Sequence, residues 1–272
     1  MISYERQNEI LELLKERRTV TVEFLCRRLF ASGATVRRDL AEMAQKGLLE
    51  RVRGGATLIS GASQDAPLLV RTQKDREKKK IAAGLALDFL EDNMTVMLDS
   101  SSTVTCLAAQ LARFKNLSVV TNGIETAGVL NENTSFKIYL CGGLIQNNSS
   151  MVGSLAQETL EHFHTDILFF SCCGISAPDL VTEANEETAA MKKLMLRNAK
   201  KKILLCDSTK MNREYFCKSC RAQEIDAIVT DAPPDQALLA SLKKQTQVIY
   251  PQSGHYLSDF YKPSSLSFLL KI

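Results

Sequence analysis

The sequence contains no run of apolar residues long enough to cross a bilayer, which takes about 20 residues in a helix. Its first residues also lack the pattern of a signal peptide, because Glu5, Arg6 and Glu9 interrupt them. Both absences argue against a membrane-spanning or exported protein. We therefore expect a cytoplasmic protein with no membrane partner.

Residues that commonly bind metal ions are also scarce. The three histidines, His162, His164 and His255, are far in sequence from Cys217 and Cys220, which have C-x-x-C spacing. No second C-x-x-C pair follows, so the ligand set of a structural zinc site is incomplete. The sequence predicts no metal site and no cofactor.

Eight cysteines in 272 residues could suggest disulfides, but five of them lie within or beside apolar runs. A free cysteine in such a place behaves as a small hydrophobic residue, so we expect most of the five to be buried thiols. A redox or metal sensor built on Cys172 and Cys173, or on Cys217 and Cys220, is a weaker alternative, because neighbouring cysteines bond to each other only with strain. The five are Cys106, Cys141, Cys172, Cys173 and Cys206.

Charge of either sign is not in large excess. The net charge is +3, and residues 1–60 hold 11 Lys plus Arg against 8 Asp plus Glu, whereas residues 61–272 hold 23 against 23. The whole excess therefore lies near the N-terminus. So small an excess is weak support for nucleic-acid binding, and the order of the predicted elements must decide.

Residues 31–40, ASGATVRRDL, combine a helix start with two arginines. Ser32 is a good N-cap, and Val36, Leu40 and Met43 follow at helical spacing, which predicts a helix over about 33–46. The opposite face has small side chains that can approach base edges, and its flanks can contact phosphates. The predicted DNA-binding residues are Ser32, Ala34, Thr35, Arg37, Arg38 and Gln45, with Arg38 and Gln45 toward bases and Thr35 and Arg37 toward phosphates.

An ordinary solvated helix, in which Arg38 pairs with Glu42, is the alternative for this segment taken alone. The preceding residues favour DNA binding, because periodic apolar residues predict two further helices, over 4–17 and 22–29. Residues 19–21 read as a short link between those two helices. Only Phe30 and Ala31 separate the second helix from the third, which is the tight connection that a helix-turn-helix requires.

The residues after the third helix predict a basic wing. Residues 48–52 are typical of a strand, and Arg51 and Arg53 precede the pair Gly54 and Gly55. Both arginines are therefore predicted to contact DNA. Residues 1–57 are expected to form one winged helix-turn-helix domain.

Residues 5–56 resemble the winged helix-turn-helix of the DeoR family of bacterial transcriptional regulators. The resemblance is carried by the run S-x-x-T-x-R-R-D-L at residues 32–40 and by R-x-x-G-G-A at residues 51–56. It implies binding to double-stranded operator DNA. One departure is that Phe30 and Ala31 stand where the family usually has a Gly-Val pair.

The rest of the chain predicts a second domain. Residues 58–75 are rich in Ser, Gly, Ala and Gln and read as a linker, and residues 76–250 alternate strand-length apolar segments with helical stretches. Such alternation is typical of a doubly wound, mostly parallel sheet, so the fold class is α/β. Residues 251–272 are a tail without an assigned role. The predicted strands are 95–98, 117–120, 137–140, 167–170, 202–205, 225–229 and 247–250.

Small and polar residues follow six of these strands, where a parallel sheet brings the strand ends to one crevice. Hydroxyls and free amides at a helix N-terminus suit a phosphate, so the best candidates are Ser100, Ser101, Ser102 and Thr103. Lys210 could add a positive charge, and Asp99 could accept hydrogen bonds from a sugar hydroxyl. Ordinary turns also favour such residues, and only their repetition favours a binding site.

Residues 71–231 resemble the sensor domain of the same family, which is related to phosphosugar isomerases. The resemblance implies a repressor of sugar catabolism that releases DNA when a phosphorylated sugar binds. It adds further effector-binding candidates, and it shows Cys173 where the family has Asp, which implies a different choice of effector. The added candidates are Thr121, Asn122, Gly142, Gly143 and Glu183.

The rival function is a phosphosugar isomerase or deaminase. In that case Asp99, Asp207, Glu183 or Lys210 would transfer protons beside the phosphate loop. An N-terminal DNA-binding domain has no use in such an enzyme, so we expect a regulator without enzymatic activity. A single helix-turn-helix reads few base pairs, which predicts a homo-oligomer, either a dimer or a tetramer.

Overall fold

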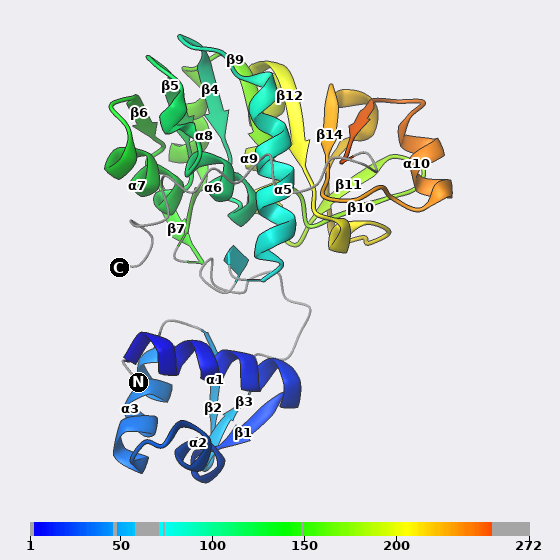
Figure 1. Cartoon of the computed structure of the whole chain (residues 1–272). Helices are drawn as coiled ribbons and strands as arrows, with labels where there is room; N and C mark the ends of the chain where they lie inside the picture. Colours follow the sequence, from blue (N-terminus) through cyan, green and yellow to red (C-terminus); the bar gives the residue numbers. More distant parts are fainter. Residues whose placement is uncertain (1–2, 46–47, 58–70, 73, 148, 252–272) are drawn as a thin grey trace. The chain divides into compact units, whose positions relative to one another are not determined.

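The structure is a computed structural model that describes residues 3–45, 48–57, 71–72, 74–147 and 149–251 (Figure 1). Contacts divide the chain into two units, residues 1–74 with 146–149 and residues 75–145 with 150–272. Residues 58–70 and 73 of the predicted linker lie outside the described residues, as do residues 252–272 of the predicted tail.

The N-terminal unit combines three helices with a small sheet. The apolar spacing predicted from the sequence is found as a common core, in which Ile10, Leu25 and Val36 come from successive helices and are fully buried. Residues 19–21, predicted as a link, form a strand instead, because they pair with residues 55–57. The elements are α1 Ser3–Arg17, β1 Thr19–Thr21, α2 Val22–Leu29, α3 Gly33–Gln45, β2 Glu50–Val52 and β3 Gly55–Thr57, with antiparallel sheet order β1-β3-β2.

The second unit contains a seven-stranded parallel sheet, and all seven predicted strands occur in it, with boundaries shifted by up to three residues. The predicted α/β fold class is therefore confirmed. The sheet order is β15-β14-β12-β9-β4-β5-β6. The strands are β4 Thr95–Leu98, β5 Ser118–Thr121, β6 Lys137–Leu140, β9 Thr165–Phe170, β12 Ala199–Leu205, β14 Ala227–Val229 and β15 Gln247–Ile249.

Helices cover both faces of this sheet (Figure 1). Alternate residues of β4 show the two layers, because Val96 and Leu98 pack in one apolar cluster while Met97 packs in the other. The first cluster includes residues of α5 Arg76–Ala86, α6 Ser102–Ala108 and α7 Ile124–Asn133. The second includes residues of α8 Ser154–Glu161, α9 Glu186–Arg197 and α10 Gln236–Leu242.

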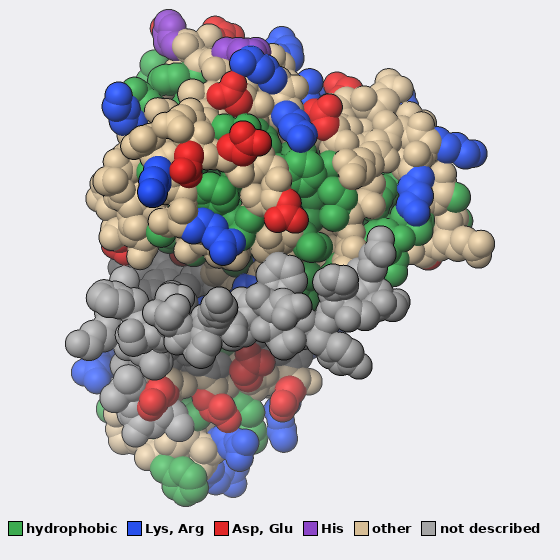
Figure 2. Space-filling view, turned by 45° about the horizontal axis from the view of Figure 1, so that its top comes forward, with side chains coloured by type: hydrophobic (Ala, Val, Ile, Leu, Met, Phe, Trp, Pro, Cys, Tyr) green, Lys and Arg blue, Asp and Glu red, His purple; other side chains and the backbone are tan. Residues whose placement is uncertain are grey.

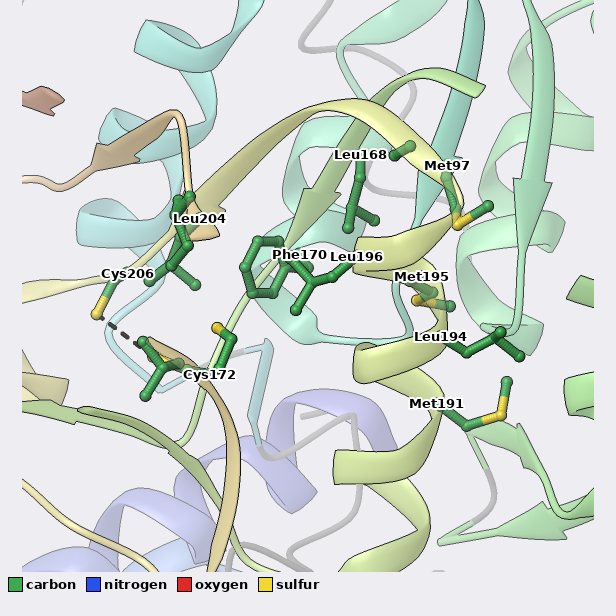
Figure 3. Packing of buried hydrophobic residues seen from close by; sticks show 14 of the residues in the cluster. Met97, Leu168, Phe170, Cys172, Met191, Leu194, Met195, Leu196, Leu204 and Cys206 are labelled. Carbon is green, nitrogen blue, oxygen red and sulfur yellow. Dashed lines mark hydrogen bonds between the residues drawn. The ribbon is translucent and has the colours of Figure 1, made fainter. Parts of the chain in front are cut away.

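Figure 3 shows part of the second cluster, in which apolar side chains of α9 and the strand residues Leu168, Phe170 and Leu204 form one buried core. Short antiparallel segments were not predicted from the sequence. They are the hairpin of β7 Leu144–Gln146 and β8 Ser150–Val152, and a sheet of β10 Gly174–Ser176, β11 Leu180–Glu183 and β13 Cys217–Arg221. Polar residues or glycine interrupt most of these segments, so they lack the apolar runs by which the strands of the main sheet were predicted.

The strand order reverses between β4 and β9. The chain proceeds outward from β4 to β5 and β6, then returns to β9 on the other side of β4 and proceeds outward through β12, β14 and β15. In open parallel sheets the crevice for ligands lies at such a point, outside the carboxyl ends of the two strands. Asp99 and Ser171 follow these two ends directly, so they mark the centre of the predicted crevice.

Candidate functional site

The turn between α2 and α3 is tight and has a defined geometry. Phe30 closes α2 in the left-handed conformation with φ 50°, and its backbone N–H donates to the carbonyl of Cys26. Its side chain is 96% exposed. Ser32 then caps α3, since its hydroxyl accepts from the N–H of Thr35 at 3.2 Å. The unusual Phe30 and Ala31 pair therefore preserves the short connection between the two helices.

The two faces of α3 differ as the sequence predicted. Val36, Leu40 and Met43 are buried, whereas Arg37 and Arg38 are exposed. Ser32 and Ala34 are also exposed, and Thr35 is half-buried beside Ser32. The backbone of α3 is described to Gln45, but the Gln45 side chain lies outside the described part of the chain.

Asp39 anchors the back of α3, a role that the sequence did not reveal. Its carboxylate is 1% exposed and accepts from two nitrogens of Arg6 on α1, at 2.6 and 3.1 Å. The same contact raises the pKa of Arg6. Asp39 thus joins α1 to α3 and holds the adjacent Arg37 and Arg38 on the solvent side.

The wing is the hairpin of β2 and β3, and Arg51 and Arg53 are exposed on it. Gly54 has φ 81°, which favours glycine in the turn. A Cβ atom on Gly55 would lie 2.1 Å from the carbonyl oxygen of Val20, so only glycine fits there. The Gly-Gly pair therefore fixes the turn that presents the two arginines.

Asp99 ties together the strand ends at the crevice of the second unit. It is 1% exposed, and its carboxylate accepts from the N–H of Ser101 and the N–H of Ser171, both at 2.9 Å. The second bond joins the end of β4 to the end of β9. Both carboxylate oxygens are therefore engaged, and Asp99 organises the crevice in addition to its predicted contact with a sugar.

The residues predicted to hold a phosphate lie at the start of α6. Ser101 is its N-cap and accepts from the N–H of Val104 at 3.3 Å. Ser102 and Thr103 are buried in the first turn, and the Ser100 hydroxyl accepts from Ser150 at 2.7 Å. Among the described residues, the buried hydroxyl of Thr103 has no hydrogen-bond partner.

Thr121 and Asn122 follow β5 and are both buried. Thr121 accepts from the N–H of Gly123, which fixes the loop. Asn122 donates from its side-chain nitrogen to the carbonyl of Met151 at 3.0 Å, while its side-chain oxygen has no partner within the part of the chain that the structure describes. A buried acceptor without a donor is costly, so a ligand hydroxyl or amine would stabilise it.

Lys192 is the main residue that the sequence analysis missed. It lies on α9 and is 6% exposed, and its ammonium donates to Glu183 at 2.7 Å and to the carbonyl of Ser171 at 2.5 Å, with Asp99 at 3.4 Å. Burial alone would lower the pKa of Lys192, but Glu183 and Asp99 outweigh it and raise that pKa. The lysine is therefore charged at neutral pH.

A signal for Lys192 does exist in the sequence. It lies four residues after Thr188 on a helix whose neighbouring positions Met191, Leu194 and Met195 are apolar. A lysine on the buried face of a helix requires charged partners. The sequence shows that face, but the charged partners lie at the ends of β4 and β11, which only the tertiary fold brings near Lys192.

Cys173, where the resemblance implies an aspartate in the family, contacts Glu183 through its thiol. Its thiol donates to Glu183 at 3.0 Å, and burial together with the nearby charge of Glu183 raises its pKa. A neutral thiol therefore replaces a carboxylate beside Glu183. Two acidic groups at this distance would repel each other, so the cysteine leaves Glu183 free to pair with Lys192.

Lys210 lies on the other side of Ser171. Its ammonium donates to the Ser171 hydroxyl at 2.7 Å and lies 3.7 Å from Asp207, which raises the pKa of Lys210 against the effect of burial. Lys79 of α5 is 4% exposed, and burial and the charge of Lys210 lower its pKa to about 8. Lys79 is therefore a buried lysine in the first turn of α5.

A small pocket brings part of the predicted set together. Asp99, Ser100 and Asn122 line it. The other predicted effector residues do not line it, and of these Gly142 and Gly143 are exposed. The residues outside the lining are Ser101, Ser102, Thr103, Thr121, Gly142, Gly143, Glu183 and Lys210. Gly143 has φ 136°, and a Cβ atom there would lie 2.6 Å from the carbonyl oxygen of Val152, so its role is local packing. The full lining is Asp99, Ser100, Asn122, Ser150, Val152, Thr188, Met191, Lys192 and Met195.

The cysteines are all free thiols. Cys141, Cys172 and Cys206 are buried as predicted, whereas Cys106 and Cys173 are half-buried. Cys172 and Cys206 meet at 3.7 Å between their sulfurs, at the ends of neighbouring strands (Figure 3). Within the described residues, no group of three or more His, Cys, Asp or Glu side chains could hold a metal ion.

Positive and negative side chains are interspersed on the visible face of the α/β unit, with no large area of one sign (Figure 2). This matches the balanced charge count of residues 61–272. None of the described helices is both long and apolar enough to span a membrane.

Comparison with known proteins matches both units. Residues 6–62 match the DeoR-like helix-turn-helix domain, and residues 73–232 match the DeoR C terminal sensor domain. The HTH-type transcriptional regulator GolR of Listeria innocua is 33% identical over 88% of this chain and 94% of its own length. The lactose phosphotransferase system repressor of Staphylococcus epidermidis is 31% identical over 85% of this chain and 93% of its own length.

Among solved structures, this chain is similar to a D-ribose-5-phosphate isomerase in complex with phospho-erythronic acid. The match covers 50% of this chain and 54% of the isomerase chain, at 20% identity and a TM-score of 0.39. The helix-turn-helix and the α/β sensor domain together define a two-domain transcriptional regulator. The chain belongs to the DeoR family.

Proposed function

We propose that the chain represses a carbohydrate-catabolism operon by binding its operator as a homo-oligomer, and that a phosphorylated sugar releases it. In this proposal, residues 1–57 bind DNA, residues 58–75 link the domains, residues 76–250 bind the effector, and residues 251–272 form a tail. The match to a repressor of a lactose phosphotransferase system supports a carbohydrate-related target.

The DNA-binding half of the proposal is carried by the separation of faces on α3. The buried face and the Asp39 contact to Arg6 hold the helix rigidly, and the exposed face presents Arg38 between small side chains. An arginine so placed can donate two hydrogen bonds to a guanine edge in the major groove. Arg37 and the wing residues Arg51 and Arg53 are assigned to phosphates.

The effector-binding half is carried by the unsatisfied side-chain oxygen of Asn122 in the pocket. The Thr103 hydroxyl and the Asn122 side-chain oxygen are buried and lack partners among the described residues. We assign the phosphate to Ser100, Ser101, Ser102 and Thr103, and the sugar hydroxyls to Asp99, Asn122 and Lys192. Three further residues support this site through hydrogen bonds. Thr121 accepts from the N–H of Gly123, Glu183 accepts from Lys192, and Lys210 donates to Ser171.

The arrangement of the carboxylates favours binding over catalysis. A base that abstracts a proton needs a free lone pair near the reacting carbon. The Asp99 carboxylate accepts two backbone N–H bonds and lies near Lys192, and Glu183 accepts from Lys192 and Cys173. Sugar-phosphate turnover that disappears in Asp99→Ala would favour the isomerase instead.

The DNA-binding half is tested by fluorescence anisotropy with DNA from the region upstream of the gene. Arg38→Ala should weaken binding by about 1–3 kcal/mol, or roughly 5- to 150-fold, and should reduce discrimination between operator and unrelated DNA. Arg113→Ala is the matched control, because Arg113 is exposed on the α/β unit. Equal loss in both variants would contradict the assignment of α3.

A further inference from the structure

The segment 138–157 contains no Asp, Glu, Lys, Arg or His in 20 consecutive residues, and no longer stretch without charge occurs in the chain. At the average charged content of 24%, a segment of this length would hold about five charged residues. A solvated surface of a folded protein normally carries such charges. The cores of protein interfaces are depleted of charged residues, whereas ordinary surfaces are not. The absence of charge in this segment therefore resembles an interface.

This segment also holds most of the exposed apolar side chains. Of the eight large hydrophobic residues that are exposed among those described, five lie between residues 139 and 155. Leu144 is 70% exposed and Leu155 is 63% exposed. Large apolar side chains that are exposed close together in one segment are unusual on a monomer and point to an interaction site. The five are Tyr139, Leu140, Leu144, Ile145 and Leu155, which we name the apolar edge surface.

The surface lies at one end of the main sheet. Tyr139 and Leu140 belong to β6, which is the edge strand and pairs only with β5 among the described strands. Leu144 and Ile145 follow on β7, and Leu155 lies on α8 (Figure 1). An edge strand beside exposed apolar side chains pairs readily with another chain unless charge protects it. The segment carries no such charge after Lys137.

We propose that the apolar edge surface is the contact through which two copies of this chain associate about a two-fold axis. A two-fold contact brings the same surface of both copies together, so a surface with charge of one sign would meet the same charge on its partner. An uncharged surface avoids this repulsion. A partner of opposite charge is disfavoured for the same reason. The inference rests on the proposed function, since reading paired half-sites requires at least two copies.

The same hairpin forms part of the candidate effector site. Leu144 and Ile145 lie on β7, while Ser150 and Val152 on the paired strand β8 line the pocket. Ser150 donates to Ser100, and the N–H of Met151 donates to the carbonyl of Asn122 at 2.7 Å. Association through this surface therefore fixes the position of one wall of the pocket.

Sedimentation velocity on the full chain, over a series of concentrations and without DNA or effector, tests the inference. The double variant Leu144→Ser, Ile145→Ser should need at least a tenfold higher concentration to associate than the wild type. Phe216→Ser is the matched control, because Phe216 is 85% exposed on the same unit but lies outside the surface, and it should associate as the wild type does.

Leu155→Lys is the second variant, since it introduces a charge on α8 without altering the hairpin, and it should weaken association in the same way. A wild-type chain that stays monomeric, or a double variant that associates normally, would overturn the inference. The inference would also be overturned if the double variant had the same sedimenting mass as the wild type but a lower melting temperature. That result would mean that Leu144 and Ile145 pack against their own chain and not against a second copy. Because DNA is absent, failure here is separate from failure of operator binding.

Discussion

Lys192 joins three parts of the sensor unit through one ammonium group. It contacts Glu183 at the end of β11, the Ser171 carbonyl after β9 and Asp99 after β4. Removing one member of a buried ion cluster leaves the others charged and unpaired, which is more costly than the loss of the pair itself. The lysine is therefore required to maintain the crevice.

Lys192→Met should lower the free energy of unfolding by about 3–5 kcal/mol at neutral pH. Lys193→Met is the matched control, because the next residue on the same helix is exposed, and it should change stability by less than about 0.5 kcal/mol. Urea denaturation followed by circular dichroism measures both. Adding Glu183→Gln to Lys192→Met should recover part of the loss, and no recovery would contradict the charge argument.

Lys79 gives the sensor unit a distinct pH dependence. Its pKa in the folded chain is lowered to about 8, from 10.5. Below about pH 8 both the folded and unfolded states bind the proton, so the cost of burying the charge is fully present. Between about pH 8 and 10.5 only the unfolded chain keeps the proton on Lys79. The free energy of unfolding therefore increases as the pH rises through this range.

Lys79→Met removes this titration. The free energy of unfolding of the variant, relative to the wild type, should therefore fall by up to about 3 kcal/mol as the pH rises from about 7 to about 10. Denaturation at several pH values measures it. Lys80→Met, which removes a half-buried lysine paired with Glu77, serves as control. A Lys79→Met difference that is constant with pH contradicts the lowered pKa.

At the scale of the elements, the cap of α3 links sequence to function most directly. Ser32 supplies both the N-cap and a hydroxyl contact to Thr35 at 2.9 Å. Ser32→Ala should lower the stability of the helix-turn-helix by about 1 kcal/mol. A thermal melt measures this loss, and Ser32→Asp, which can also cap, should retain stability. Equal destabilisation by both would show that the cap is unimportant.

The elements also show how far the sequence could predict the structure. Segments with a clear apolar period were found as predicted, because the alternation of Val96, Met97 and Leu98 and the helical spacing of Val36, Leu40 and Met43 are local properties. The hairpin of β7 and β8 and the sheet of β10, β11 and β13 were not predicted. Polar residues or glycine interrupt most of their apolar pattern, and β13 depends on pairing with β11, which is distant in the sequence.

The candidate site was predictable to the same extent. Asp99, Ser100 and Asn122 follow strands, and the parallel order brings them to one pocket. Lys192 and Ser150 reach that pocket from α9 and β8, which the strand-end rule does not cover. Cys173 was recognised as a departure from the family, but its thiol contact with Glu183 required the folded chain.

At the scale of the whole molecule, the proposal is that one chain reads DNA through α3 and reports the occupancy of the crevice. Coupling between two such sites is reciprocal. An effector that lowers the affinity of the chain for the operator must therefore bind less tightly when the operator is bound. Because β7 pairs with β8, and β8 contacts Ser100 and Asn122, the proposed association surface lies beside the pocket. A change in association is therefore one physical route by which the effector can act.

The most direct test is an anisotropy titration of the full chain on its upstream DNA, with and without a panel of sugar phosphates and the corresponding unphosphorylated sugars. The account predicts sequence-selective binding that at least one sugar phosphate weakens tenfold or more, while the free sugar has no effect. Asn122→Ala should bind the DNA normally and lose this response. Absence of selective binding, or binding that no sugar phosphate alters, would contradict the account.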